Sequence, residues 1–152
     1  MILFEEHPYA ESTIRGILSA PEVSDFIAGE ARSNGFSASS WGNKLATRGS
    51  IIYSMEDGEV HGFAILYMHG SPDKGMYIAV GFVNQHIRSR GIYQKIMREI
   101  FVRAREKGFE WVWAYISTRN ARSVRFHERM GFDFVEVVEK PSGSLHVIRY
   151  NL

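Results

Sequence analysis

The sequence predicts an α/β (α+β) fold: a mixed, mostly antiparallel sheet with a central parallel β-α-β unit and helices on both faces. Three observations support this. The chain has 152 residues, of which 45% are hydrophobic, which suits one domain with a substantial core. Asp57-Gly58 separates two strand patterns and is a strong hairpin signal. An amphipathic helical pattern separates strand patterns 75–83 and 109–117, so these two strands should be parallel.

The first half of the chain alternates between helical and strand patterns. Pro21 is compatible with the start of a helix, and Asn34-Gly35 should end that helix. Residues 36–49 are rich in Ser, Gly, Asn and Thr and are expected to form a loop. The elements predicted here are a strand at 2–5, helices at 10–18 and 22–33, strands at 50–56 and 59–68, and a turn at 69–74 that contains Pro72.

The second half begins with the strand at 75–83, where Gly81 indicates a bulge or a close backbone approach. Apolar residues then recur every four positions from Ile92 to Ala104, which predicts a helix, and Gly108 should stop it. The remaining predicted elements are a strand at 109–117, a helix at 120–130, and strands at 132–138 and 145–150 joined by a turn at 141–143.

Composition narrows the classes of function. The sequence contains no cysteine, no apolar run long enough to span a bilayer and no signal-peptide pattern at residues 1–6. A cytoplasmic protein without membrane contact is therefore expected. Residues 1–85 hold 5 Lys/Arg against 10 Asp/Glu, whereas residues 86–129 hold 11 against 4. This asymmetry favours an anionic partner on one side and a cationic one on the other, although an ordinary mixed surface is the alternative.

The most informative segment is residues 83–93. A strand leads into a polar turn that contains Arg88, Arg90 and Gly91, and a helix follows immediately. The first N–H groups of a helix have no partner within the helix, and the helix dipole also favours negative charge there. Together with the two guanidinium groups, this junction predicts an anion site, and phosphate is the expected anion.

Two segments resemble motifs of one family. Arg88-Ser89-Arg90-Gly91-Ile92-Tyr93 resembles the Arg/Gln-x-x-Gly-x-Gly/Ala turn of the GNAT superfamily of acetyl-CoA-dependent N-acetyltransferases. Residues 120–132 resemble the later Asn-x-x-Ser/Ala-x-x-Phe/Leu-Tyr-x-x-x-Gly-Phe segment of the same family. The resemblance covers residues 50–138 well and implies that residues 1–152 form a single GNAT-like acetyltransferase domain.

The resemblance also implies roles for individual residues. The turn would wrap the pyrophosphate of CoA with its backbone N–H groups, and the pantetheine arm would lie where the two parallel strands splay apart. A backbone N–H near Val83 would stabilise the oxyanion. Arg129, together with Arg122 and Arg125 on one helical face, would contact the 3′-phosphate of CoA or RNA, or would simply face solvent. The implied cofactor-binding residues are Phe82, Val83, Arg88, Ser89, Arg90, Gly91, Ile92, Tyr93, Asn120, Ser123 and Arg129.

Two residues depart from the family pattern. Tyr93 replaces a small residue. A Tyr side chain at a helix N-terminus can point outward, so the backbone N–H donors remain, and the phenol could add a hydrogen bond. His127 replaces the Tyr thought to protonate the departing CoA thiolate, and is either a general acid or a packing residue. Residues 76–84 contain no Asp, Glu or His to serve as a base. The candidates elsewhere are Glu30, His61, Tyr115, Ser117 and His146.

The expected function is therefore transfer of an acetyl group from acetyl-CoA to a primary amine, with His127 and Val83 as the catalytic residues. The acceptor would be a small amine, an amino acid or an amino sugar. The alternatives are an acyl-CoA-binding module without transferase activity and a protein N-terminal acetyltransferase. Neither a metal nor a nucleic acid is expected. Trp111 and Trp113 alternate along one strand face and should lie in the core or at the contact of a homodimer.

Overall fold

The computed structural model describes residues 1–69 and 73–152, so residues 70–72 of the predicted turn lie outside the described residues. Seven strands form one sheet in the order β1-β2-β3-β4-β5-β7-β6. All neighbouring strands are antiparallel except β4 and β5, which are parallel. The strands are β1 Ile2–Glu5, β2 Ser50–Glu56, β3 Glu59–Tyr67, β4 Gly75–Val83, β5 Trp111–Ser117, β6 Asp133–Lys140 and β7 Gly143–Asn151.

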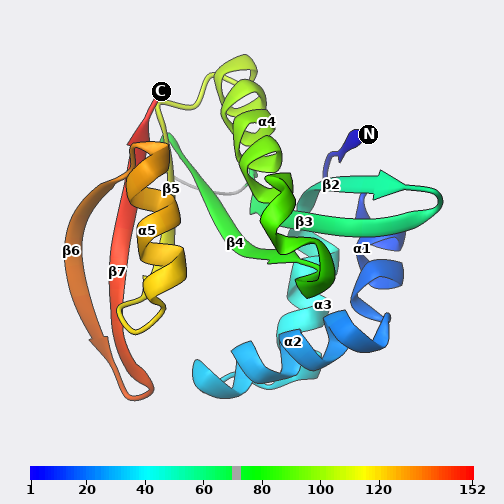
Figure 1. The fold of residues 1–152 in the computed structure, drawn as a ribbon, viewed down its shortest axis with the longest axis horizontal. Helices are drawn as coiled ribbons and strands as arrows, with labels where there is room; N and C mark the ends of the chain where they lie inside the picture. Colours follow the sequence, from blue (N-terminus) through cyan, green and yellow to red (C-terminus); the bar gives the residue numbers. More distant parts are fainter. Residues whose placement is uncertain (70–72) are drawn as a thin grey trace.

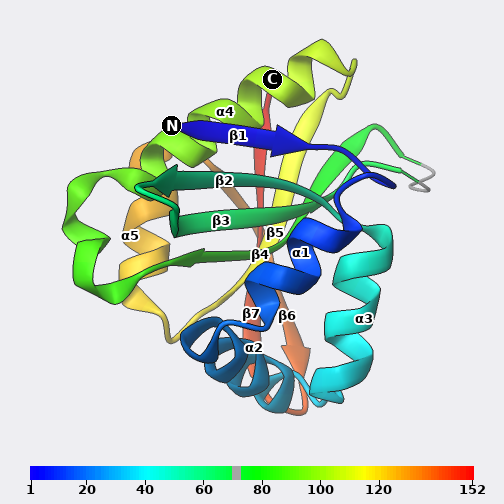
Figure 2. The same cartoon turned by 90° about the vertical axis from the view of Figure 1, so that its right-hand side faces the viewer.

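Helices cover both faces of this sheet, and the two faces bury separate apolar cores (Figures 1 and 2). α4 packs Ile96 and Ile100 against one face, and α1, α2 and α3 pack residues such as Ile14 and Ile27 against the other. The predicted α/β fold with a central parallel unit is thus confirmed. The helices are α1 Glu11–Leu18, α2 Pro21–Ser33, α3 Ala38–Arg48, α4 Ile92–Glu106 and α5 Ala121–Met130, with a 3-10 helix, η1, at Gln85–Arg90.

The loop expected at residues 36–49 is wrong, because α3 occupies most of this segment. Ser37 caps the helix by accepting a hydrogen bond from the Ser40 N–H. Leu45 and Ala46 are buried in the core that α3 shares with α1 and α2. Burial of these residues outweighs the weak helix propensity of the Ser, Gly and Asn residues around them.

The hairpin prediction is confirmed at Asp57-Gly58, where both residues have positive φ, 50° and 75°. Gly108, which was predicted to stop α4, also has a positive φ of 81°. The polar turn predicted after Val83 is instead the 3-10 helix η1. These local features bring the start of α4 back beside the end of β4.

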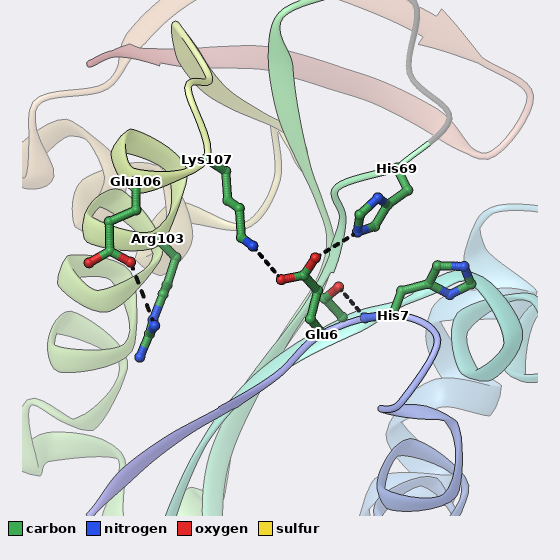
Figure 3. Close-up of polar contacts among 7 residues, drawn as sticks. Glu6, His7, His69, Arg103, Glu106 and Lys107 are labelled. Carbon is green, nitrogen blue, oxygen red and sulfur yellow. Dashed lines mark hydrogen bonds and ion pairs between the residues drawn. The ribbon is translucent and has the colours of Figure 1, made fainter.

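A small polar cluster fixes the opposite end of α4 (Figure 3). The Glu6 carboxylate accepts a hydrogen bond from Lys107 Nζ at 2.6 Å and lies 3.1 Å from Nε2 of His69. The neighbouring His7 N–H donates to Ser50 Oγ at 2.9 Å. The cluster therefore ties the end of β1 to the end of β3 and to the residue that follows α4.

Candidate active site

The parallel strands β4 and β5 part soon after they meet. They form three residue pairs, the last between Tyr77 and Trp113. Beyond that point β4 stays paired with β3 as far as Val83, and β5 stays paired with β7 as far as Ser117. Figure 1 shows the two strands diverging from this meeting point. We call the region between residues 78–83 of β4 and residues 114–117 of β5 the splay.

Backbone groups of β4 face into the splay. The Asn84 N–H donates to the His61 carbonyl at 2.9 Å, so this pair is hydrogen-bonded across β3 and β4. In antiparallel strands the hydrogen-bonded and non-bonded pairs alternate, and Val83 is paired with Gly62 one position along. The N–H groups of Val83 and Gly81 therefore point away from β3, towards β5. This is the direction that the proposed oxyanion role of Val83 requires.

The start of α4 is open to an anion. Gly91 is the N-cap, has a left-handed φ of 70° and makes no side-chain cap. Other residues would adopt this conformation at a cost of about 1–2 kcal/mol. The first helical bond runs from the Lys95 N–H to the Gly91 carbonyl at 3.2 Å, which leaves the N–H groups of residues 92–94 without helical acceptors. Arg90 is exposed here, whereas the side chains of Arg88 and Ser89 lie outside the described part of the structure.

Tyr93 points inward, against β4, rather than outward as the start of a helix also allows. A Cβ built on Gly81 would lie 1.9 Å from the Tyr93 hydroxyl, and the Tyr93 ring is 5.4 Å from the ring of Phe126 on α5. The close approach predicted at Gly81 is real, but it is made by a side chain rather than by backbone. Burial raises the pKa of Tyr93 above its usual range. The phenol is thus neutral and lies beside the splay.

α5 begins at the other side of the splay. The Asn120 Oδ1 accepts a hydrogen bond from the Ser123 N–H at 3.1 Å and caps the helix, which leaves the Asn120 amide NH₂ for other partners. His127 is 7% exposed, and its Nδ1 lies 2.7 Å from the Ser123 carbonyl oxygen. Because the carbonyl can only accept, Nδ1 carries the proton. Desolvation by burial lowers the pKa of His127, so the ring is neutral and its Nε2 is unprotonated near pH 7.

The outer face of α5 is basic. Arg122, Arg125 and Arg129 are all exposed. Within the described residues, none of the three forms an ion pair with an acidic side chain. Their guanidinium groups are available to an anionic ligand, as the sequence pattern suggested.

An acidic groove lies at the end of β4, on the face covered by α1 and α2. It has a volume of about 430 Å³ and combines polar and apolar walls. Phe82, which packs against Phe26 at 5.2 Å between ring centroids, contributes part of the apolar wall. The residues that give the groove its polar character and its charge are Ser12, Thr13, Glu22, Glu59 and Asn84. Sequence reasoning did not select Glu22 or Glu59; the only signal was the acidic excess of the first half of the chain.

The five candidate bases lie on four elements: Glu30 on α2, His61 on β3, Tyr115 and Ser117 on β5, and His146 on β7. Among the described hydrogen bonds, none joins two of them, and their partners lie on different elements. Ser117 Oγ accepts from the Arg119 N–H at 3.2 Å, and the ring of His146 packs on Phe134. Glu30 differs from the others because partial desolvation of its carboxyl raises its pKa above 4.5, although the residue keeps much of its surface exposed. It lies one helical turn after Phe26, on the same face of α2.

A second groove, of about 320 Å³, lies on the uncovered face of β5 and β7. Trp111, Trp113 and Tyr115 line it, and the Arg149 guanidinium lies 4.1 Å from the centroid of the Trp111 ring. The two tryptophans are half-buried, and the homodimer contact stays a prediction. In the described part of the chain, no cluster of His, Asp and Glu could hold a metal ion. None of the described helices has the length and apolarity to cross a bilayer.

Comparison with known proteins agrees with this geometry. The model of the acetyltransferase (GNAT) family matches residues 21–132. No curated protein matches the chain significantly. The fold matches a ribosomal-protein-alanine N-acetyltransferase from Brucella melitensis at 17% identity, covering 100% of this chain and 99% of that one, with a TM-score of 0.72. It also matches an IAA acetyltransferase from Bacillus cereus at 16% identity, covering 100% of both chains, with a TM-score of 0.69.

A third match is a protein described as an acetyltransferase from Salmonella typhimurium, solved with its cofactor acetyl-CoA. It shares 18% identity, with coverage of 99% of this chain and 92% of that one, and a TM-score of 0.69. The chain belongs to the GNAT family of acetyltransferases. It is therefore an acyltransferase, and acetyl-CoA is the donor that this family uses. The uncapped start of α4 and the inward-facing N–H groups of β4 fit that donor, because they offer hydrogen bonds to phosphate and carbonyl oxygens.

Proposed function

We propose that this acetyltransferase acetylates the primary amine of a small cationic molecule by direct attack. The observation that carries the proposal is the acidic groove, which shares the end of β4 with the splay. Its volume is in the range typical of small-molecule sites. Glu22 and Glu59 attract an ammonium group and repel an acceptor that carries its own carboxylate. Phe82 accordingly belongs to the acceptor side rather than to the cofactor side, because its N–H points towards β3.

The donor would be held by three parts of this chain. The N–H groups at the start of α4, from Ile92 to Gln94, bind the diphosphate. Arg90 and the basic face of α5 attract its remaining phosphate charge. The amide NH₂ of Asn120 and the N–H of Gly81 bond the pantetheine arm. When bound, acetyl-CoA supplies an acetyl group activated as a thioester.

The residues that we propose to act in the transfer have separable tasks. The Val83 N–H donates to the carbonyl oxygen and stabilises its developing negative charge. Glu30 is the base that we propose, because a carboxyl with a raised pKa is better matched to removing a proton near neutral pH. His127 packs against Phe132 and orients no proton towards the splay. Holding amine and carbonyl together supplies much of the rate.

An acceptor panel tests this function. Release of free CoA from acetyl-CoA would be followed with diamines, amino sugars, amino acids and peptides that have a free N-terminus. We expect kcat/KM to be highest for amines that lack a carboxylate. Replacing both Glu22→Gln and Glu59→Gln should remove the preference and leave the KM for acetyl-CoA unchanged.

Two other results would overturn the proposal in different ways. Peptides favoured over every small amine would make the protein an N-terminal acetyltransferase. Tight binding of acetyl-CoA without transfer to any acceptor class would indicate a binding module instead.

A further inference from the structure

We propose that the Tyr93 hydroxyl donates a hydrogen bond to the thioester sulfur of acetyl-CoA and to the CoA thiolate as it leaves. This inference rests on the proposed function and adds a catalytic residue to it. It concerns a position at which the sequence departs from the family motif, where a small residue stands.

The Tyr93 side chain packs directly over Gly81. The position a Cβ of residue 81 would occupy is 1.9 Å from the Tyr93 hydroxyl and 2.6 Å from the ring carbon that bears it. No side chain larger than that of glycine is compatible with this packing, so the two residues form a matched pair on different elements. Gly81 lies in the splayed part of β4, four residues beyond the last β4–β5 pair at Tyr77. The hydroxyl is therefore at the edge of the splay.

Gly81 and Val83 direct their N–H groups into the splay, and the Val83 N–H is the proposed donor to the reacting carbonyl oxygen. The Tyr93 ring also contacts Phe126, so it bridges α4 and α5 where they flank the two strands. In this proposal, a thioester whose oxygen bonds to the Val83 N–H directs its sulfur to the Tyr93 hydroxyl, which lies over Gly81 two residues earlier on β4.

Desolvation alone raises the pKa of Tyr93, and no described residue supplies a hydrogen-bond partner to its hydroxyl. A partly desolvated donor without a protein partner gains free energy when a ligand provides an acceptor and excludes water. Because a thiol is more acidic than this phenol, Tyr93 donates a hydrogen bond and keeps its proton. When the N–C bond forms, the C=O electron pair moves onto oxygen and the amine proton passes to the base. When the C=O bond re-forms, the C–S bond breaks, its electron pair leaves with sulfur, and the thiolate takes its proton later from water.

His127 is less suited than Tyr93 to donate a hydrogen bond to the sulfur. The one ring proton of neutral His127, on Nδ1, is directed to the Ser123 carbonyl at 2.7 Å. Its Nε2 could donate only in the imidazolium form, which burial disfavours. His127 thus serves as a control for the assignment to Tyr93.

A binding cycle tests the proposal without an acceptor. Wild type, Tyr93→Phe and His127→Asn would be titrated calorimetrically with CoA and with desulfo-CoA, which lacks the sulfur. We expect Tyr93→Phe to weaken CoA binding about three- to tenfold and to leave desulfo-CoA binding unchanged. The loss should grow as the pH rises and the bound thiol ionises, because hydrogen bonds to charged groups are stronger. His127→Asn should affect both ligands equally.

Equal effects of Tyr93→Phe on the two ligands, or a sulfur-dependent effect in His127→Asn, would overturn the inference and leave the proposed function standing. Failure of wild type to bind CoA would overturn the proposed function itself. Tyr93→Phe should melt at the wild-type temperature, because the hydroxyl has no protein partner to lose, so a lost affinity is not explained by unfolding.

Discussion

Tyr93 and His127, the two residues that depart from the family motifs, both turn into the protein. Tyr93 packs over Gly81, and His127 packs between Phe126 and Phe132. The sequence did reveal both departures and the unusual glycine in a strand. It could not reveal that Tyr93 fills the space that Gly81 leaves, because the two residues meet only after β4 and α4 fold against each other.

The role of Val83 depends on the direction of its backbone N–H, which follows from sheet geometry rather than from its side chain. Its place at the end of a parallel strand was predictable from the β-α-β pattern. The direction of its N–H depends on the register with β3, and a shift by one residue would reverse it. Register is set by the whole hairpin and its bulge between Ile65 and Leu66, so the pattern of residues 75–83 alone does not determine it.

Glu30 should make turnover depend on pH. As an acid whose pKa is raised, it is protonated over a wider range below neutrality, and only its deprotonated form can act as a base. Wild-type kcat should therefore fall as the pH drops through a value above 4.5. Glu30→Gln should lower kcat about a hundredfold or more and abolish this acidic limb. An unchanged pH–rate profile in the variant would exclude Glu30.

The stability of that variant provides its control. A raised pKa means that the folded state disfavours the charged carboxylate of Glu30. This cost to folding stability is fully present above the pKa of the folded state and absent below the pKa of the unfolded state. Near pH 7, Glu30→Gln removes this penalty. Its melting temperature should equal or exceed that of wild type, and lost turnover would not reflect unfolding.

At the scale of elements, most helices and strands were predictable because the spacing of the apolar residues and the positions of the turn-forming residues indicated the same boundaries. The hairpin at Asp57-Gly58 and the stop at Gly108 each have the backbone conformation that their residue types favour. α3 was missed because its sequence contains Ser, Gly and Asn at many exposed positions, while its buried face is narrow. Contacts with α1 and α2 stabilise it, and such contacts are not visible in a local window.

The Glu6 cluster should make a pH-dependent contribution to the stability of the fold. The hydrogen bond from Lys107, and to a lesser extent His69, lowers the Glu6 pKa below 4.5 despite an opposing effect of desolvation. The ionised Glu6 therefore stabilises the folded protein fully above pH 4.5, and this stabilisation is lost as the pH falls through the lower pKa of the folded state. Glu6→Gln should lower the melting temperature at pH 7 by a few degrees at most, because the site is largely screened by solvent.

The difference between Glu6→Gln and wild type should disappear in acid, where both side chains are neutral. Glu11→Gln is a matched control, since it removes an exposed pair with Arg15 within one helix. Thermal melts from pH 7 down to about pH 3 provide the comparison. A Glu6→Gln difference that persists unchanged at the lowest pH would contradict the assigned role.

At the scale of the whole molecule, charge is divided between two sites that meet at the end of β4. The basic excess of residues 86–129 includes Arg90 at the start of α4 and the three exposed arginines of α5, and the acidic groove lies among residues of the first half. The sequence predicted both signs of charge. It could not predict that the groove and the splay share one strand end, because this depends on how three N-terminal helices cover the sheet.

Calorimetric titration of CoA into wild type, Gly91→Gln and Gly91→Glu tests the central claim most directly. Both variants strain the same left-handed residue, and they differ only in a charge beside the N–H groups that open α4. We predict that wild type binds, that Gly91→Gln binds more weakly, and that Gly91→Glu is weaker than Gly91→Gln by at least about tenfold. Equal affinities for all three proteins would contradict a phosphate site at the start of α4.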